Sequence, residues 1–98
     1  MKILDQKRIL DQLRVHFDEM KGRFSVCKVG LFGSYIHNSA SQNSDIDLLV
    51  DFDDPTFDNY MDLKFYLEGL FDRKVDLVMR DTVKPRLKAS IDQDVIYA

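Results

Sequence analysis

The sequence predicts an α/β (α+β) fold in which helices pack on a small mixed β-sheet. Stretches with apolar residues at helical spacing alternate with short strand-like runs, in the order helix, strand, helix, strand, helix, strand, helix, strand. The predicted strands 45–52 and 74–79 are joined by a helix, which suits a right-handed crossover. We therefore expect one layered domain over residues 1–98.

Length and charge limit the possible classes of protein. The chain has 98 residues, which is enough for one domain and too short for two separate cores. Its formal net charge of −3 disfavours nucleic acid as a ligand of this chain alone, because such binding normally needs a basic face. No stretch is typical of a signal peptide or a membrane span, so we expect a cytoplasmic protein with no membrane partner.

The first predicted element is an amphipathic helix over residues 5–20. Asp5 is its expected N-cap and Gly22 its expected C-terminal stop. A buried strand follows over residues 24–32 and contains Cys27, which we expect to be a small buried hydrophobe. The residues that recur at helical spacing are Ile9, Leu10, Leu13, Phe17 and Met20.

The second strand carries the clearest alternation in the chain. After Gly33 we expect one or two helical turns and then a loop through Asn43, followed by a strand over residues 45–52. The side chains expected on one face of that strand are Ile46, Leu48, Val50 and Phe52. Those expected on the other face are Asp45, Asp47, Leu49 and Asp51.

The second half of the chain is predicted in the same way. Residues 53–56 form a turn, and helical spacing returns over residues 57–71. A short strand follows over residues 74–79. Pro85 is then expected to open a helix that runs to about Ile91, and residues 95–97 to form an edge strand.

Two aspartates on the second strand suggest a metal site. Asp45 and Asp47 are two residues apart, so their carboxylates point in one direction from a strand. Carboxylates that lie this close repel each other unless a cation lies between them. Mg²⁺ is the expected cation, because it takes hard oxygen ligands and combines one or two carboxylates with substrate phosphates.

Asp76 is the third candidate acid. It lies on the next predicted strand between apolar Val75 and Leu77, where a charge needs a reason. If that strand is adjacent to the strand of Asp45 and Asp47, the three acids converge and suit phosphoryl transfer with two metal ions. Asp76 would then hold a metal or accept the proton of an attacking hydroxyl.

The pair Gly33-Ser34 is the expected phosphate-binding turn. Glycine lets a backbone approach closely, and free N–H groups at the start of a helical turn attract phosphate. The hydroxyl of Ser34 adds a donor. A Ca²⁺ site is the alternative for the acids, but their spacing does not match the twelve-residue Ca²⁺-binding loop.

Together these residues resemble a known family signature. Gly33-Ser34, ten intervening residues and then Asp45-Ile46-Asp47 resemble that of the DNA polymerase beta-like nucleotidyltransferase superfamily. Asp76 is similar to the third acid of that family. The resemblance covers nearly the whole chain and is similar in particular to the stand-alone minimal nucleotidyltransferases, the MntA-like antitoxins that act beside a helical HEPN-domain toxin.

The resemblance implies a fold, a site and a reaction. It implies a nucleotidyltransferase fold, with Asp45, Asp47 and Asp76 as catalytic and metal-binding residues. It also implies Mg²⁺, ATP as the donor, and an antitoxin that transfers AMP to a tyrosine of its HEPN-domain partner.

One departure from the family pattern keeps two alternatives open. His37 stands where the family commonly has arginine, and Asn38 where it commonly has glycine. Arginine forks onto phosphate and a neutral imidazole does not. The first alternative is therefore a catalytically weak module that neutralises a HEPN toxin by contact. The second is the catalytic part of a two-chain small-molecule nucleotidyltransferase, which the short length disfavours.

The remaining polar residues are expected to be structural or solvated. His16 is expected to face solvent or a neighbouring side chain, and Asp51 to lie at a solvated strand end. Tyr35 is expected either to stack on the nucleotide base or to pack against the sheet. The small basic cluster near Pro85, which is expected to lie on a surface helix, consists of Lys84, Arg86 and Lys88.

Overall fold

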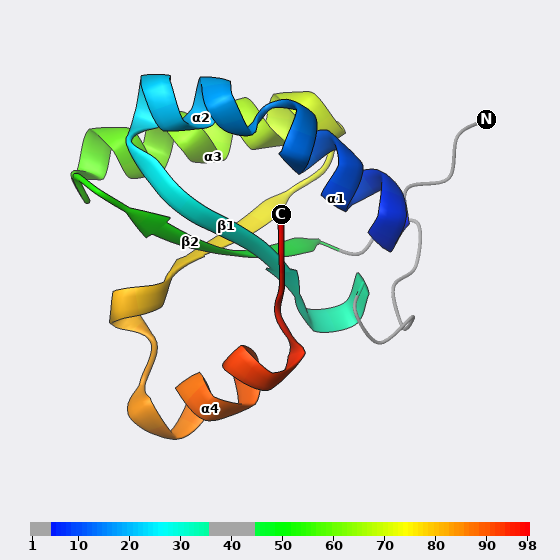
Figure 1. Cartoon of the computed structure of the whole chain (residues 1–98), viewed down its shortest axis with the longest axis vertical. Helices are drawn as coiled ribbons and strands as arrows, with labels where there is room; N and C mark the ends of the chain where they lie inside the picture. The colour runs from blue at the N-terminus through cyan, green and yellow to red at the C-terminus, as the bar shows by residue number, and fades with distance from the viewer. Residues whose placement is uncertain (1–4, 36–44) are drawn as a thin grey trace.

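The computed structural model describes residues 5–35 and 45–98, arranged as helices on a four-stranded sheet (Figure 1). The α-helices are α1 (Gln6–Val15), α2 (Phe17–Phe24), α3 (Phe57–Phe71) and α4 (Pro85–Asp94). The strands are β1 (Val26–Phe32), β2 (Ile46–Phe52), β3 (Val75–Met79) and β4 (Ile96–Tyr97). Two short 3₁₀ turns, η1 (Gly33–Tyr35) and η2 (Arg80–Thr82), follow β1 and β3. The predicted α+β class is confirmed.

The sheet is mixed, with the strand order β3-β2-β1-β4. β1 pairs antiparallel with β2 on one side and with β4 on the other. β2 pairs parallel with β3, and α3 forms the crossover between them, as predicted. This order places β2, which carries two of the candidate acids, next to β3, which carries the third.

The main core lies between one face of the sheet and the layer of α1, α2 and α3 (Figure 1). β2 contributes Ile46, Leu48 and Val50 to this face, all fully buried. The parallel register aligns Ile46 with Val75 and Leu48 with Leu77 of β3, so the apolar residues of both strands face the same helices. The alternation of apolar and acidic residues on β2 therefore fixes which face of the sheet is covered.

The predicted first helix is broken in two at His16. Asp5 caps α1 as expected, because its carboxylate accepts from the backbone N–H of Arg8 at 2.9 Å. α1 ends at Val15, and α2 begins at Phe17. At the break, the ring of His16 contacts Tyr66 of α3, with 3.1 Å between the imidazole Nδ1 and the phenol oxygen. Helical spacing continues through the break, so the sequence pattern did not reveal it.

The predicted helix stop at Gly22 is wrong. Gly22 lies inside α2, which continues to Phe24. Phe24 was expected to open the strand, but its side chain is buried in the core from the helix. The helix ends at Ser25, which takes the left-handed conformation with φ 64°.

The prediction that Cys27 is buried is also wrong, because β1 contains a bulge. Val26 pairs with Phe52 and Lys28 with Asp51, so Cys27 is an extra residue on β1 without a counterpart on β2. The bulge interrupts the alternation, and both Cys27 and Lys28 are exposed.

The later elements agree closely with the prediction. α3 has the predicted bounds, whereas α4 runs three residues further than expected, to Asp94. The outer edge of β3 is covered by side chains of α3. The hydroxyl of Tyr60 donates to the carbonyl of Leu77 at 2.6 Å, and the carboxylate of Glu68 accepts from the N–H of Val75 at 3.0 Å. These bonds occupy backbone groups that an edge strand would otherwise expose.

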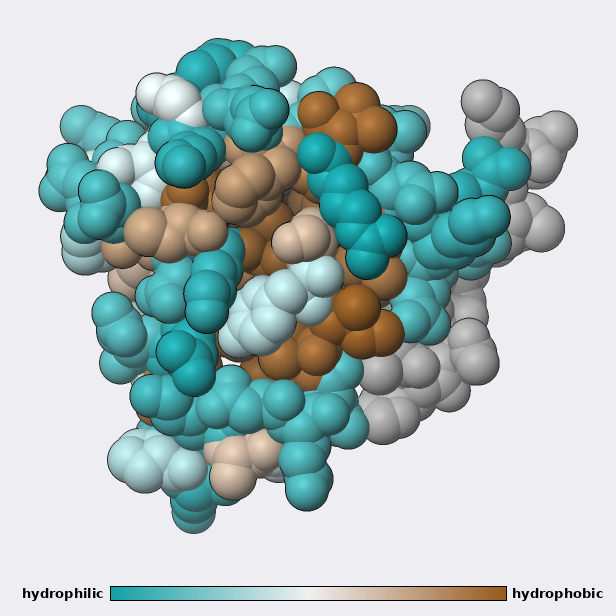
Figure 2. Space-filling model, viewed as in Figure 1, coloured by the Kyte–Doolittle hydropathy of each residue, from teal (hydrophilic) through white to brown (hydrophobic). Residues whose placement is uncertain are grey.

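The surface is mostly hydrophilic in the view of Figure 2, with hydrophobic residues gathered around the C-terminal end of the chain. In the described ranges 5–35 and 45–98, no helix is both long enough and apolar enough to span a membrane.

Candidate functional site

The second face of the sheet, which faces away from α1, α2 and α3, carries the candidate acids. Asp47 on β2 pairs in register with Asp76 on β3, so their side chains leave the sheet side by side on this face. Neighbouring strands are about 4.8 Å apart. The parallel register therefore brings together two carboxylates that are far apart in the sequence.

Asp45 is the remaining acid of the predicted triad. It immediately precedes β2 and its side chain is exposed. Asp76 is also exposed, which corrects the expectation of an apolar context: the buried neighbours Val75 and Leu77 point to the opposite face. Among the described residues, no lysine or arginine forms an ion pair with Asp45 or Asp76.

Gly33 places the turn after β1 against Asp47. Phe32, the last residue of β1, pairs with Asp47, and the next residue, Gly33, has φ +79°. A Cβ atom at Gly33 would collide with the carboxylate of Asp47. Only glycine combines this conformation with such a close approach. Gly33 and Asp47, which the sequence analysis assigned to the same site, are thus adjacent in the structure.

The rest of the predicted turn is only partly described. The backbone of Ser34 belongs to η1, but the position of its hydroxyl lies outside what the structure describes. His37 and Asn38, and the predicted loop through Asn43, also lie outside the described residues. Tyr35 is only 4% exposed within the core cluster, so it packs in the core, and its base-stacking alternative is not supported.

Asp51 lies at the opposite end of β2 and pairs in register across the sheet with Lys28. The pKa of the Arg80 guanidinium is raised chiefly by Asp92, whose carboxylate lies 3.6 Å away, and to a smaller extent by Tyr97 and Asp51. Asp45 and Asp76 form no ion pair among the described residues.

Side chains of the C-terminal segment cover Gly30 on the second face. A Cβ atom at Gly30 would come within 2.6 Å of the Val95 side chain and 3.0 Å of the Tyr97 ring. Gly30 is the register partner of both Tyr97 and buried Leu49. The sequence reasoning did not single out Gly30, although glycine within a strand often indicates that another backbone approaches closely.

Arg80 was also not predicted as a structural anchor. Its guanidinium joins η2 to α4 through Asp92, at 3.6 Å. α4 has no buried residue, and it projects away from the sheet (Figure 1). Its basic residues Lys84 and Arg86 are exposed and Lys88 is half-buried, in agreement with the predicted surface helix.

The donor set suits Mg²⁺ that arrives with a nucleotide. Within residues 5–35 and 45–98, no three His, Cys, Asp or Glu side chains form a ready-made metal cage. Mg²⁺ does not require one, because it commonly takes one or two carboxylates and completes its octahedron with water and phosphate oxygens. Asp47 and Asp76 supply two adjacent hard carboxylates, and Asp45 stands at the entrance to the same face.

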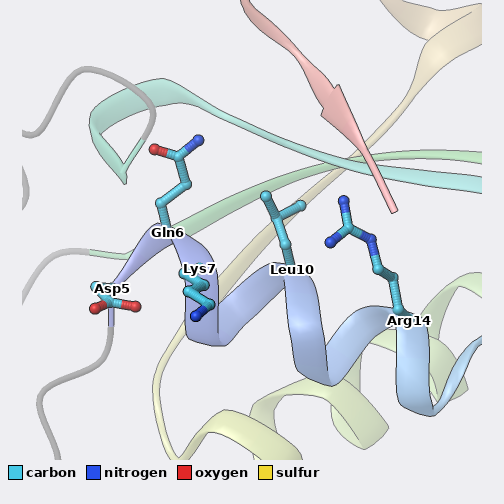
Figure 3. Close-up of a pocket in the computed structure, with 5 residues that line it drawn as sticks. All are labelled: Asp5, Gln6, Lys7, Leu10 and Arg14. Atoms are coloured by element: carbon cyan, nitrogen blue, oxygen red, sulfur yellow. The ribbon is translucent and has the colours of Figure 1, made fainter.

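A separate pocket lies on α1 and contains none of the predicted site residues. Figure 3 shows Gln6, Leu10 and Arg14 pointing from one side of the helix, with Asp5 and Lys7 nearby. These side chains combine both signs of charge with one leucine. The second face of the sheet remains the better candidate, because it joins two carboxylates in register to a glycine turn.

Comparison with known proteins supports this interpretation of the fold. Residues 13–98 match the family model described as a nucleotidyltransferase domain. The chain is 37% identical over 98 residues to protein adenylyltransferase MntA of Thermococcus cleftensis, covering 99% of each chain.

Solved structures show the same fold. A protein assigned as a minimal nucleotidyltransferase superposes with a TM-score of 0.75 at 31% identity, covering 98% of each chain. An MNT antitoxin in complex with tri-AMPylated HEPN toxin of Shewanella oneidensis matches with a TM-score of 0.66 at 20% identity, covering 94% of this chain and 70% of that chain. The second likeness shows shared fold alone. Together with the sequence match, these findings mean that the chain belongs to the nucleotidyltransferase domain family and is a nucleotidyltransferase enzyme of the minimal type, similar to MntA.

Proposed function

We propose that this enzyme transfers AMP from ATP to a partner protein, and that the partner is a HEPN-domain toxin which the transfer neutralises. The observation that carries the proposal is the in-register pair Asp47 and Asp76, held against the Gly33 turn. The named activity of the similar MntA protein, protein adenylyltransfer, agrees with this chemistry.

Asp45, Asp47 and Asp76 are the residues that would hold Mg²⁺. When bound, the metal neutralises phosphate charge and orients the reacting oxygens. The chain contributes the acids from the start of β2 and from the adjacent register position of β3. Gly33 contributes a backbone without a side chain, so the phosphates of the donor can approach the acids closely.

In the proposed reaction, a hydroxyl oxygen of the partner attacks the α-phosphorus of ATP. A new P–O bond to the partner forms while the bond to the β-phosphate oxygen breaks, and pyrophosphate leaves. In this proposal Asp76, which is exposed on the second face, accepts the proton of the attacking hydroxyl. The acids belong to the face opposite the helical layer, so the acceptor side chain approaches from that side.

The HEPN-domain acceptor is supported by a structural relative, whose own complex contains an AMPylated HEPN toxin. The surface of this chain is acidic overall, with a net charge of −3, which suits a basic partner.

The test is transfer of labelled AMP from ATP to the HEPN-domain protein of the same organism, with Mg²⁺ present. Asp45→Asn/Asp47→Asn should lose transfer and also lose Mg²⁺-dependent ATP binding in titration calorimetry. Asp51→Asn is the matched control, since Asp51 lies on the same strand and face but pairs across the sheet with Lys28. It should keep both properties.

Two outcomes would contradict the proposal. If the double variant still protects cells from the toxin as well as the wild-type chain, neutralisation occurs by contact and catalysis is dispensable. If labelled AMP appears on a small molecule and never on the HEPN-domain protein, the acceptor class is wrong.

A further inference from the structure

The outer face of α3 carries aromatic side chains that the rest of the chain does not cover. Phe57 is 75% exposed and Phe65 is 61% exposed. Met61, half-buried, lies between them at a spacing of four residues from each, so the three form one line along the helix. The buried residues of α3, Leu63, Leu67 and Phe71, lie on its opposite side. The apolar line is therefore not part of the core.

Gly69 extends this line toward the end of α3. It is exposed, and a Cβ atom at this position would have no neighbour within 4 Å. Glycine within a helix is unfavourable relative to alanine, and nothing in the described chain compensates for it here. A glycine next to exposed Phe65 is instead what close approach of another backbone would require.

Acidic residues surround the apolar line. Asp58 and Asp62 are exposed on the same outward side of α3 as Phe65 and Gly69, and Asp72 is exposed at the C-terminal end of the helix. The only lysine or arginine of α3 is Lys64, which is half-buried. The outer face thus combines a hydrophobic centre with a negative rim, the arrangement typical of a protein interface.

We propose that the outer face of α3 is a docking surface for a basic protein: Phe57, Met61, Phe65 and Gly69 form its centre and Asp58, Asp62 and Asp72 its rim. The partner is expected to present an apolar patch ringed by lysine and arginine, because only that charge complements the rim. This inference rests on the proposed function in one respect: the HEPN-domain partner is the occupant to which we assign the surface.

A second copy of this chain is disfavoured as the occupant. Two copies meeting through this face would bring the same aspartates together, and like charges across an interface repel. The face also belongs to the helical layer, on the opposite side of the sheet from Asp47 and Asp76 (Figure 1). The proposed docking surface and the candidate acids therefore lie on opposite sides of the sheet.

The test measures the affinity of the purified HEPN-domain protein for variants of this chain by titration calorimetry. Phe65→Ser should weaken binding roughly tenfold or more, as expected for a central aromatic residue of an interface. Val15→Ser is the matched control, because Val15 is 72% exposed but lies on α1. It should bind as the wild-type chain does.

Gly69→Ala separates folding from docking. In the isolated chain it should raise the melting temperature by a few degrees, since the new methyl group meets open space and alanine favours the helix. The same variant should weaken binding of the HEPN-domain protein. A variant that is more stable and yet binds less tightly cannot be explained by misfolding.

Each outcome distinguishes this inference from the proposed function. If AMP transfer to the HEPN-domain protein is normal and the α3 variants bind with unchanged affinity, the docking surface is refuted while the function stands. If the wild-type chain neither binds nor modifies that protein, both fall. If sedimentation of the chain alone shows a dimer that Phe65→Ser disperses, the occupant is a second copy and the basic-partner assignment is overturned.

Discussion

At the scale of single residues, the parallel register of β2 and β3 explains why two aspartates occupy adjacent positions. Asp47 and Asp76 each lie between two buried apolar residues of their strand. Because successive side chains of a strand point to opposite faces, both aspartates point to the second face. Like charges directly opposite each other on neighbouring strands destabilise a sheet, by roughly 0.2–1 kcal/mol. The pair therefore carries a small cost in stability at the position of the proposed cation site.

Asp76→Asn should separate stability from activity. Removing one of the adjacent charges should leave the free energy of unfolding unchanged or raise it by a few tenths of a kcal/mol without divalent cations. AMP transfer should fall by about 10²-fold or more, as for loss of a general base. Thermal melts with and without Mg²⁺, together with a transfer assay, measure both effects. A large drop in melting temperature would instead make Asp76 a structural residue.

Gly33→Ala should damage both properties at once. The positive φ costs a residue other than glycine about 1–3 kcal/mol, and the new methyl group collides with the carboxylate of Asp47. We expect lower stability in denaturant titrations and loss of Mg²⁺-dependent ATP binding. Gly22→Ala is the control, since its Cβ would meet open space, and it should be neutral or stabilising.

The positions of the acids on one face could be predicted from the sequence, because a period of two decides which way a strand residue points. The adjacency of Asp47 and Asp76 depended on strand order, which the sequence analysis left open and the structure supplies. The exposure of Asp76 could not be inferred from its apolar neighbours Val75 and Leu77, since these lie on the other face. Catalytic roles for the acids remain a prediction that activity measurements must test.

At the scale of elements, the sequence predicted the helices and strands whose apolar spacing is regular. It did not predict the positions at which a helix or strand is interrupted. α3 has the predicted bounds because its apolar spacing is regular and Thr56 caps its first turn. The break at His16 and the bulge at Cys27 both leave the local composition unchanged. The helix break is accompanied by a contact with a distant part of the chain, that of His16 with Tyr66. Such a contact cannot be predicted from the spacing of nearby residues.

Charged side chains of α2, as well as packing, act on Tyr66 at the contact between α2 and α3. Burial raises the pKa of the Tyr66 hydroxyl, and the nearby carboxylate of Glu19 raises it further. Arg23 lies over the rings of both Phe24 and Tyr66, at 5.0 and 5.5 Å from their centres. The neutral phenol is thus the form that the folded contact favours.

Ser25→Gly should stabilise the protein, because Ser25 ends α2 in the left-handed conformation with φ 64°. Glycine adopts this conformation without the Cβ penalty, so the gain should be about 0.5–1 kcal/mol. Chemical denaturation measures it. Ser25→Ala is the matched comparison and should not stabilise, since alanine retains the Cβ. Equal stability of the two variants would contradict the backbone explanation.

At the scale of the whole molecule, the chain divides its two sheet faces between stability and chemistry. One face carries the helical layer and most of the buried side chains. The other carries the acids at one end and is crossed by the C-terminal segment at Gly30. α4, held by the ion pair of Arg80 and Asp92, projects from this second face. Changes on the second face should therefore affect activity more than folding, unless they displace the C-terminal segment.

Gly30→Val should displace that segment. Valine favours strands, but its side chain would occupy the space of the Val95 and Tyr97 side chains. We expect a loss of about 1–3 kcal/mol and faster hydrogen exchange over residues 80–98, with exchange in α1 to α3 little changed. Mass spectrometry of peptides after exchange resolves the two regions. Uniformly faster exchange would show that the C-terminal segment and the core unfold as one unit.

The hydrogen bonds from α3 to the edge of β3 have a consequence for the behaviour of concentrated solutions. Tyr60 and Glu68 occupy backbone groups that an incoming strand from another molecule would need. Growth of ordered β-aggregates is thereby hindered at this edge and directed to the other, where β4 is only two residues long and leaves much of β1 uncovered. If this protein forms fibres under stress, strands of other molecules should therefore pair first with the β1 edge. At the β3 edge, α3 prevents such pairing.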